Sequence, residues 1–149
     1  NRGCSFSLQK GVLNELKPGR KPFHTLNPAL ARLHDGRVMV YGTMGGDGQP
    51  QTQAAVFTRA IVYGQSLLQA VAAPRWLLGR TWGQSSDSLK LEARFGSEVV
   101  QSLRQRGHQI EILHDFDEAM GHAGAIIRHS NGTLEGASDP RSDGGVTCF

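Results

Sequence analysis

The sequence predicts a mixed α+β fold in which most strands pair antiparallel. Two residue pairs, Asp35-Gly36 and Asn131-Gly132, predict tight β-hairpins, because these residue types readily adopt the left-handed backbone that a type I′ turn requires. Each pair lies between two short apolar runs, which supply the paired strands. Three other segments carry apolar residues at helical spacing. With 149 residues, the chain has room for about one domain.

Short apolar runs predict the strands, which begin only after an irregular N-terminal segment. Glycines and prolines interrupt the first 28 residues, so neither a long helix nor a central strand is expected there. Residues 74–89 are also expected to form a loop, and Ile110 and Ile112 are expected on one buried face of their strand. The expected strands are residues 29–34, 37–41, 90–94, 108–113, 125–129 and 133–137.

The three predicted helices are marked by their first and last residues. Pro50 suits the first turn of the first helix, and Gly64 ends it. The second begins with the capping-box pattern Ser66-Leu67-Leu68-Gln69 and stops before Pro74. Ser97 is expected to cap the third helix, which Gly107 closes.

Charge and composition exclude several classes of function. Sixteen Lys and Arg against thirteen Asp and Glu give a net charge of +3, too small and too evenly spread to suggest nucleic-acid binding or a membrane surface. No apolar run is long enough to span a membrane. The six histidines follow no zinc-binding spacing, so neither a metal nor a cofactor is expected. Cys4 and Cys148 make no disulfide framework, and whether they pair is left open.

The glycine-rich segment at residues 42–48 is the most informative candidate for chemistry. It leaves a predicted strand and meets a helix N-terminus, where backbone N–H groups can approach a ligand closely. A phosphate loop would need Gly-Lys-Ser/Thr, but the segment reads Gly46-Asp47-Gly48-Gln49, and the third glycine of a dinucleotide fingerprint is absent. An oxyanion hole is therefore favoured over a phosphate site, with a plain strand-to-helix turn as the alternative.

Further candidates lie in the irregular N-terminal segment. His24 and Thr25 lie in a proline-bounded loop, where side chains tend to be presented rather than packed. Arg2 could offer a planar donor to a substrate carboxylate, with Ser5 nearby, or could simply be solvated. Thr25 has no free α-amino group, and no Gly-x-Ser-x-Gly elbow is present. The residues alone therefore give no complete catalytic set.

Four segments, taken in order, resemble motifs of the γ-glutamyltranspeptidase family. Residues 18–28, PGRKPFHTLNP, resemble PGKRPLSSMxPT, and residues 42–46, GTMGG, resemble GSPGG. Residues 73–75 match APR, and residues 136–141, GASDPR, match GAxDPR. Each motif is weak alone, but together they cover nearly the whole chain.

The resemblance implies that residues 1–149 are the C-terminal portion of the small, catalytic subunit of an N-terminal-nucleophile hydrolase, and not an independent domain. Such enzymes form a four-layer αββα sandwich with mainly antiparallel sheets, and they self-cleave to expose a catalytic threonine. That threonine is expected upstream of Asn1. The large subunit and the upstream part of the small subunit, from the same precursor, are the expected partners. The opening at Asn1, which reads like a loop interior, agrees with this expectation.

The same resemblance implies roles for individual residues. Gly45 and Gly46 match the glycine pair of the oxyanion hole. His24 and Thr25 fall on the Ser-Ser pair that holds the glutamyl carboxylate, and only Thr25 keeps a hydroxyl.

The first six residues depart from the family pattern in a way that changes which charge on a substrate they would favour. They fall on NNEMDDF, whose acidic residues hold the glutamyl α-amino group; here Arg2 replaces the Glu or Gln, and Cys4-Ser5 replaces Asp-Asp. An α-ammonium group needs a carboxylate partner, whereas Arg2 and Ser5 suit an anion or a neutral amide. The pattern is similar to the oxamate amidohydrolase branch of the family, which serves purine-nitrogen catabolism.

The expected function is therefore hydrolysis of a small acid amide such as oxamate through an acyl-enzyme. A γ-glutamyltransferase or glutathione hydrolase is the first alternative, and a non-catalytic family member is the second. The compartment is not identified by these residues, and the cytoplasm is expected over the periplasm.

Overall fold

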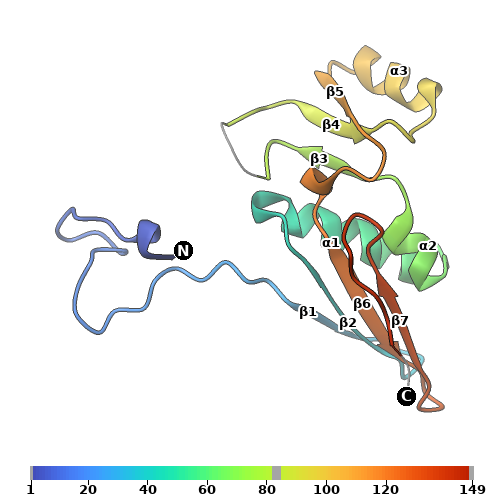
Figure 1. The fold of residues 1–149 in the computed structure, drawn as a ribbon, viewed down its shortest axis with the longest axis horizontal. Coiled ribbons are helices and arrows are strands. Elements are labelled where there is room, and N and C mark those ends of the chain that lie inside the picture. The colour runs from blue at the N-terminus through green and yellow to red at the C-terminus, as the bar shows by residue number, and fades with distance from the viewer. Residues whose placement is uncertain (1, 82–84, 148–149) are drawn as a thin grey trace.

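The chain forms two β-sheets with helices packed against them (Figure 1). The structure, a computed structural model, describes residues 2–81 and 85–147. The larger sheet has the order β1-β2-β6-β7 and is antiparallel throughout; its strands are β1 (Ala29–Arg32), β2 (Val38–Thr43), β6 (Ala123–Arg128) and β7 (Leu134–Ser138). The smaller has the order β3-β4-β5, from β3 (Trp76–Leu78), β4 (Leu89–Glu92) and β5 (Ile110–Leu113).

The helices are short and lie between the strands in sequence. They are α1 (Gln49–Phe57), α2 (Leu67–Ala72) and α3 (Ser97–Gln105), with the π-helix η3 (Thr58–Val62) continuing α1 and the 3₁₀ turns η1 (Arg2–Ser5), η2 (Gly46–Gly48) and η4 (Glu118–Met120). None of the helices in the described residues is both long and apolar enough to cross a membrane.

Both predicted hairpins are confirmed. β1 pairs with β2 and β6 pairs with β7, each around its predicted turn. Gly36 and Gly132 have φ of 85° and 88°, a conformation that favours glycine, but Asp35 and Asn131 do not have positive φ. Neither turn is therefore of type I′, which needs positive φ at both central residues. The capping box is confirmed as well: the Ser66 hydroxyl accepts from the Gln69 backbone N–H at 3.2 Å, and the Gln69 side chain accepts from the Ser66 N–H at 3.1 Å.

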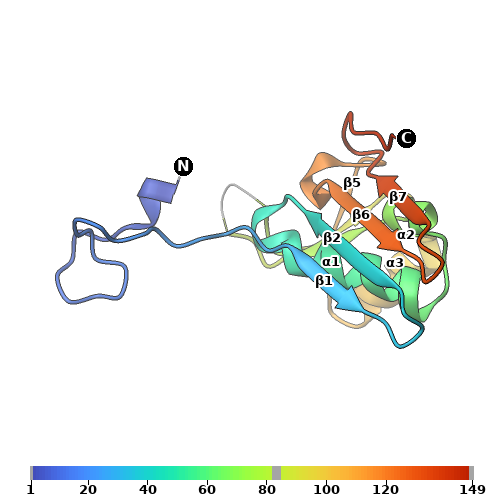
Figure 2. The ribbon, with the colours of Figure 1, turned by 90° about the horizontal axis from the view of Figure 1, so that it is seen from below.

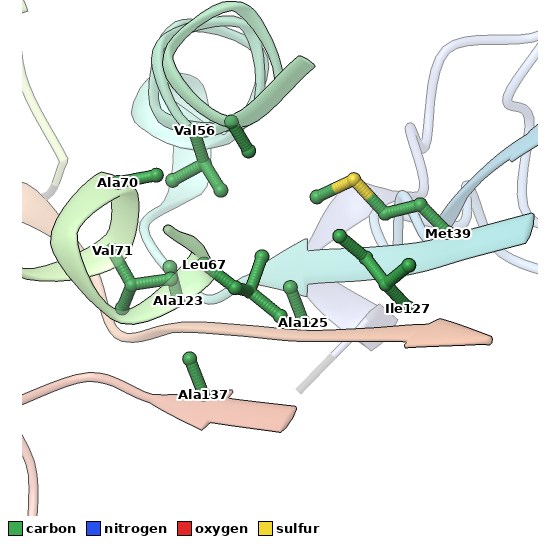
Figure 3. Close-up of a cluster of buried hydrophobic side chains, with 10 residues drawn as sticks. Met39, Val56, Leu67, Ala70, Val71, Ala123, Ala125, Ile127 and Ala137 are labelled. Atoms are coloured by element: carbon green, nitrogen blue, oxygen red, sulfur yellow. The ribbon is translucent and has the colours of Figure 1, made fainter. Parts of the chain in front are cut away.

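The core lies between the larger sheet and the two helices that cover one of its faces (Figure 3). Alternation along β2 buries Met39 and leaves Val40 exposed. β6 alternates in the same way, with Ile127 among its buried residues. The helices contribute Val56 and Leu67 to the same cluster. Burying an aliphatic side chain of this size contributes about 1.5–3 kcal/mol, so the cluster fixes α1 and α2 on the sheet.

Three local predictions are wrong. Residues 74–89 contain the strand β3, in which Leu77 is buried between exposed neighbours; three residues are too few to show a period in the sequence. Gly96, not Ser97, is the N-cap of α3, because Ser97 already has its place in the first turn. Ile112 is 44% exposed, so the face it shares with Ile110 is only partly covered.

The pairing of β4 with β5 is parallel, unlike every other strand pair described. The chain crosses from one to the other through α3, as a parallel connection requires. The prediction of mainly antiparallel sheets is nevertheless confirmed, since the four remaining pairs are antiparallel.

The second face of the larger sheet is apolar, and no helix among the described residues packs against it. Leu30, Val40 and Ile126 point to this face and are 63%, 42% and 48% exposed. Figure 2 views the four strands with the helices behind them. The C-terminal segment contacts the face at β7, where a Cβ added to Gly136 would lie 2.8 Å from the Val146 side chain.

The N-terminal segment runs away from both sheets before it reaches β1 (Figures 1 and 2). Two glutamines of α1 tie its last residues to the body. The Gln49 side chain donates to the Thr25 carbonyl at 3.2 Å, and the Gln53 side chain donates to the Asn27 carbonyl.

Candidate active site

Five of the six predicted site residues line one open cleft of about 1090 Å³. They are Arg2, His24, Thr25, Gly45 and Gly46. The cleft lies where the N-terminal segment passes the loop between β2 and α1. Ser5, the sixth, is not among the lining residues; its carbonyl accepts from the Asn14 side chain at 2.8 Å.

The glycine loop leaves β2 at Thr43 and turns into η2 and α1. Gly45 has φ of 137° and Gly46 has φ of 50°, a region that residues with a side chain rarely adopt. At Gly46 space excludes a side chain as well, because a Cβ there would overlap the Thr81 carbonyl oxygen. A Cβ on Gly45 would lie 3.4 Å from the Gly121 Cα, an ordinary contact, so at this position it is the backbone conformation that selects glycine. The backbone itself therefore forms this wall of the cleft.

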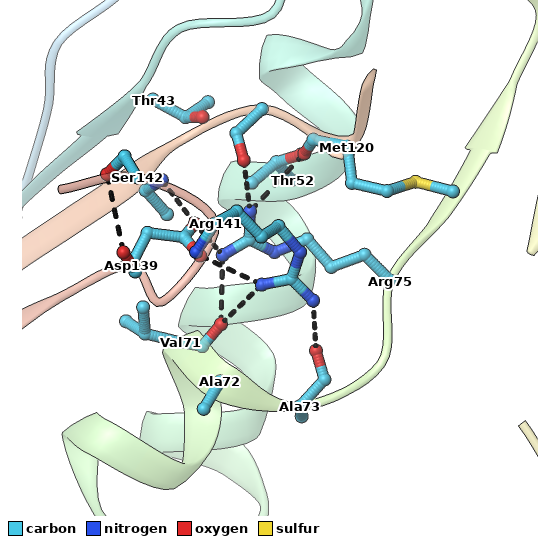
Figure 4. Close-up of polar contacts among 12 residues, drawn as sticks. Thr43, Thr52, Val71, Ala72, Ala73, Arg75, Met120, Asp139, Arg141 and Ser142 are labelled. Carbon is cyan, nitrogen blue, oxygen red and sulfur yellow. Dashed lines mark hydrogen bonds and ion pairs between the residues drawn. The ribbon is translucent and has the colours of Figure 1, made fainter. Parts of the chain in front are cut away.

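Residues 119–121 support the glycine loop from below. Gly121 has φ of 80°, and a Cβ there would overlap the Met44 carbonyl oxygen, so the two segments are in direct contact. Three side chains hold the carbonyls of this supporting segment. The Thr52 hydroxyl donates to Met120 at 3.1 Å, and the Arg75 guanidinium donates to Gly121 at 2.8 Å; Figure 4 draws Thr52 and Arg75. The Thr81 hydroxyl donates to Ala119 at 2.5 Å.

Arg75 belongs to a buried network of ion pairs that joins two of the sequence motifs. Its Nη2 lies 2.6 Å from Asp139 Oδ2, and both side chains are at most 1% exposed. Arg141 pairs with Asp139 at 2.9 Å and with Glu92 at 2.6 Å. Asp139 also accepts from the Ala123 backbone N–H at 2.6 Å. The APR and GAxDPR motifs therefore meet in this network (Figure 4), and their residues are not among those that line the cleft.

The network keeps its members charged despite their burial. Burial lowers the pKa of Arg75 to about 10, helped by the like charge of Arg141, so Arg75 remains protonated at neutral pH. Burial opposes ionisation of Glu92, but hydrogen bonds from Arg141 and Arg94 hold its pKa below the ordinary value. Asp139 behaves in the same way, since the Arg75 charge and two backbone N–H groups outweigh its burial and lower its pKa.

The structure adds site residues that the sequence did not single out. Arg80 and Thr81 line the cleft, and Gly121 supports its glycine loop. Glu92 joins the buried network from the end of β4. None of these residues lies in a recognised motif. A turn marked by Gly79 is the one signal that the chain offers near Arg80.

The described part of the chain contains no cluster of side chains that could bind a metal, and it contains one of the two cysteines. No cluster of three or more His, Cys, Asp or Glu within residues 2–81 and 85–147 is placed to hold a metal ion. Cys4 is exposed and free, whereas Cys148 lies outside the described residues, so their pairing is not addressed.

Comparison with known sequences identifies the family. The model of the gamma-glutamyltranspeptidase family matches residues 2–149. The oxamate amidohydrolase proenzyme of Klebsiella pneumoniae is 68% identical over all 149 residues, and the glutathione hydrolase-like YwrD proenzyme of Bacillus subtilis is 45% identical over 97% of the chain. This chain spans only 28% and 27% of the length of those two relatives.

Solved structures agree with this grouping. The cephalosporin acylase of Bacillus halodurans matches 99% of the chain with a TM-score of 0.75 and 31% identity, and the match covers 27% of that protein. The gamma-glutamyltranspeptidase of Pseudomonas nitroreducens complexed with L-DON matches 100% of the chain with a TM-score of 0.73 and 26% identity, over 80% of that chain. The arrangement of sheets and helices is therefore that of N-terminal-nucleophile hydrolases of this family.

The buried network makes stability depend on acid pH. Because the carboxyl pKa values of Glu92 and Asp139 are lowered in the folded state, the unfolded state binds protons first as the pH falls. The contribution of the network is complete above the ordinary values of 4.5 and 3.8 and is lost as the pH falls through the lowered ones. We expect Glu92→Gln to destabilise the full-length protein by about 3–5 kcal/mol at pH 7, and by less at pH 4.

Thermal or urea unfolding between pH 4 and pH 7 measures this difference. Glu98→Gln, on the exposed surface of α3, is the matched control and should leave the pH profile unchanged. A Glu92→Gln variant with the pH profile of the wild type would show that the network is not the source of acid sensitivity.

Proposed function

Because the chain belongs to the gamma-glutamyltranspeptidase family, we propose that it is part of an amide hydrolase and carries the oxyanion hole of its active site. The observation that supports this proposal is the cleft in which Gly45 and Gly46 lie with Arg2 and Thr25. The nucleophile is a threonine of the same precursor, outside residues 1–149. As in the wider family, cleavage of the precursor exposes it.

The reaction follows from what the glycine loop can stabilise. The threonine hydroxyl attacks the amide carbon, and the carbonyl oxygen becomes an oxyanion that the Gly45 and Gly46 N–H groups bind. Collapse of this intermediate releases ammonia from a primary amide and leaves an acyl ester on the threonine. Water then hydrolyses the ester and restores the hydroxyl.

The charges of the cleft support a small acid amide as the substrate. Arg2 and Arg80 both line it, and Asp47 is the single acidic residue among the described lining residues. A guanidinium binds a carboxylate in a bidentate manner, whereas the α-ammonium of a γ-glutamyl donor would meet like charge here. The 68% identical Klebsiella relative is named for oxamate, which is such an acid amide.

Glutathione hydrolysis is the second candidate, and the 45% identical Bacillus relative, named as glutathione hydrolase-like, supports it. In that case the acids that hold the α-amino group would come from residues outside this chain. A non-catalytic role is the third candidate; it predicts a precursor without a threonine at the processing site.

The apolar second face of the larger sheet supports the proposed partners. Leu30, Val40 and Ile126 form a face that a single sheet layer leaves in water. In a four-layer sandwich this face packs against a second sheet. We assign that sheet to the upstream part of the small subunit and to the large subunit, so residues 1–149 are one piece of a shared core.

The oxyanion assignment predicts a large kinetic effect at Gly46. Gly46→Ala in the full-length enzyme should reduce kcat by about 10²–10³, because the added Cβ overlaps the Thr81 carbonyl and turns the N–H away from the oxyanion. Gly42→Ala is the matched control, since a Cβ there meets nothing within 4 Å. Processing of each variant is followed by gel electrophoresis, so that a loss of kcat is compared between equally processed enzymes. Equal kcat values for the two variants would make the loop purely structural.

The substrate assignment is tested on two amides. The wild type should prefer oxamate to a γ-glutamyl anilide, measured as kcat/KM. Arg2→Ala should raise KM for oxamate by about 30-fold or more, since loss of a charge partner of a bound carboxylate costs roughly 2–5 kcal/mol. A wild type that prefers the γ-glutamyl donor, and in which Arg2→Ala changes neither substrate, would transfer the assignment to glutathione hydrolysis.

The partner assignment predicts opposite effects in the fragment and in the full-length protein. Residues 1–149 expressed alone should bind a hydrophobic dye and lack a cooperative thermal transition. Val40→Thr should improve the solubility of the fragment but destabilise the full-length protein, where the face is covered. A dispersed amide spectrum and cooperative melting of the isolated fragment would contradict the assignment.

A further inference from the structure

We propose that Arg80 is a specificity-determining residue that binds the anionic end of the substrate. This proposal rests on the function proposed above and names a residue to which neither the sequence motifs nor the comparisons assign a role. Arg80 lines the same cleft as Gly45, Gly46 and Arg2.

The backbone fixes Arg80 next to the oxyanion loop. β3 ends at Leu78, and Gly79 turns the chain with φ of 88°. Thr81, which follows Arg80, makes two contacts that hold it in place. Its hydroxyl donates to the Ala119 carbonyl at 2.5 Å, and its own carbonyl oxygen occupies the space that a Gly46 Cβ would fill. The Arg80 Cα is therefore placed by a residue in direct contact with the proposed oxyanion hole.

Arg80 makes an ion pair with Asp47 that a substrate carboxylate can replace. Arg80 Nε lies 4.0 Å from Asp47 Oδ2, and the two side chains are 42% and 81% exposed. Exposed pairs at this distance contribute about 0–1 kcal/mol, so a carboxylate that competes with Asp47 replaces a weak interaction. A substrate carboxylate that enters the cleft can form the shorter, bidentate hydrogen bonds that a guanidinium prefers.

The position of Asp47 ties this ion pair to the catalytic loop. Asp47 follows Gly46 directly, so Arg80 pairs with the residue next to a proposed oxyanion donor. An acid amide such as oxamate has its carboxylate on the carbon next to the reacting carbonyl. One guanidinium beside the glycine loop can therefore bind the carboxylate while the loop N–H groups bind the carbonyl oxygen. A neutral amide of the same size gains only the second interaction.

The experiment compares oxamate with its neutral diamide, oxamide, in the full-length, processed enzyme. Arg80→Ala should raise KM for oxamate at least tenfold and change KM for oxamide less than threefold. Arg80→Lys should recover part of the loss, because it keeps the charge but not the planar fork. Arg104→Ala, on the exposed surface of α3, is the matched control and should alter neither substrate.

A binding measurement separates failure of this proposal from failure of the proposed function. Oxalate carries the same carboxylate without a cleavable amide, and its binding by calorimetry needs no turnover. If the wild type hydrolyses neither amide but binds oxalate at least tenfold more tightly than Arg80→Ala, the proposed function fails and the role of Arg80 stands. If the wild type and Arg80→Ala bind oxalate equally, or if neither binds it, Arg80 does not bind the anionic group. The same conclusion follows if Arg80→Ala raises KM for oxamide and oxamate by the same factor.

Discussion

The rest of the structure depends on the buried ion pairs that connect Arg75 and Arg141 to Asp139 and Glu92. They join three segments that are far apart in the sequence: the residues before β3, the end of β4 and the residues after β7. Removing four charges from water is costly, and the cost is offset only when each charge has partners of opposite sign and its remaining donors and acceptors are bonded. Here the guanidinium groups also bond to main-chain carbonyls, including those of Val71 and Gly121. The network thus specifies one packing of the two sheets.

The glycine loop inherits its geometry from this network. Arg75 holds the Gly121 carbonyl, Gly121 contacts Met44, and Met44 precedes the proposed oxyanion donors. An oxyanion hole is effective when its N–H groups are already oriented before charge develops, because no reorganisation is then needed in the transition state. Two motifs that carry the family resemblance, APR and GAxDPR, therefore support the cleft without lining it.

The features that could be predicted from the sequence are those set by local chemistry. The turns at Gly36 and Gly132 and the capping box at Ser66 depend on a few consecutive residues, and all three are present. The resemblance added the long-range arrangement, and five of the six residues it pointed to line one cleft. The strand β3 was missed because its three residues acquire their role only by pairing with β4. Arg80 and Glu92 were missed for the same reason, since Asp47 and Arg141, with which they pair, lie 33 and 49 residues away in the chain.

The proposed oxyanion loop and the proposed substrate-binding residues of the N-terminal segment rest on different supports in this chain. The glycine loop lies on a buried network and on the core helices, whereas Arg2 and His24 belong to a segment that leaves the body (Figure 1). Among the described contacts, the side chains of two glutamines of α1 hold the last residues of that segment. Substitutions in the N-terminal segment can therefore change which end groups are accepted without moving the oxyanion donors. This division explains how the chain keeps the glycine pair and both arginine motifs while it departs from the family pattern at Arg2 and Ser5.

Arg80 belongs to the side of the cleft that the core supports, since its neighbour Thr81 contacts the glycine loop. A carboxylate bound there would be positioned by residues that the core holds, and Arg2 would add a second positive charge from the N-terminal segment.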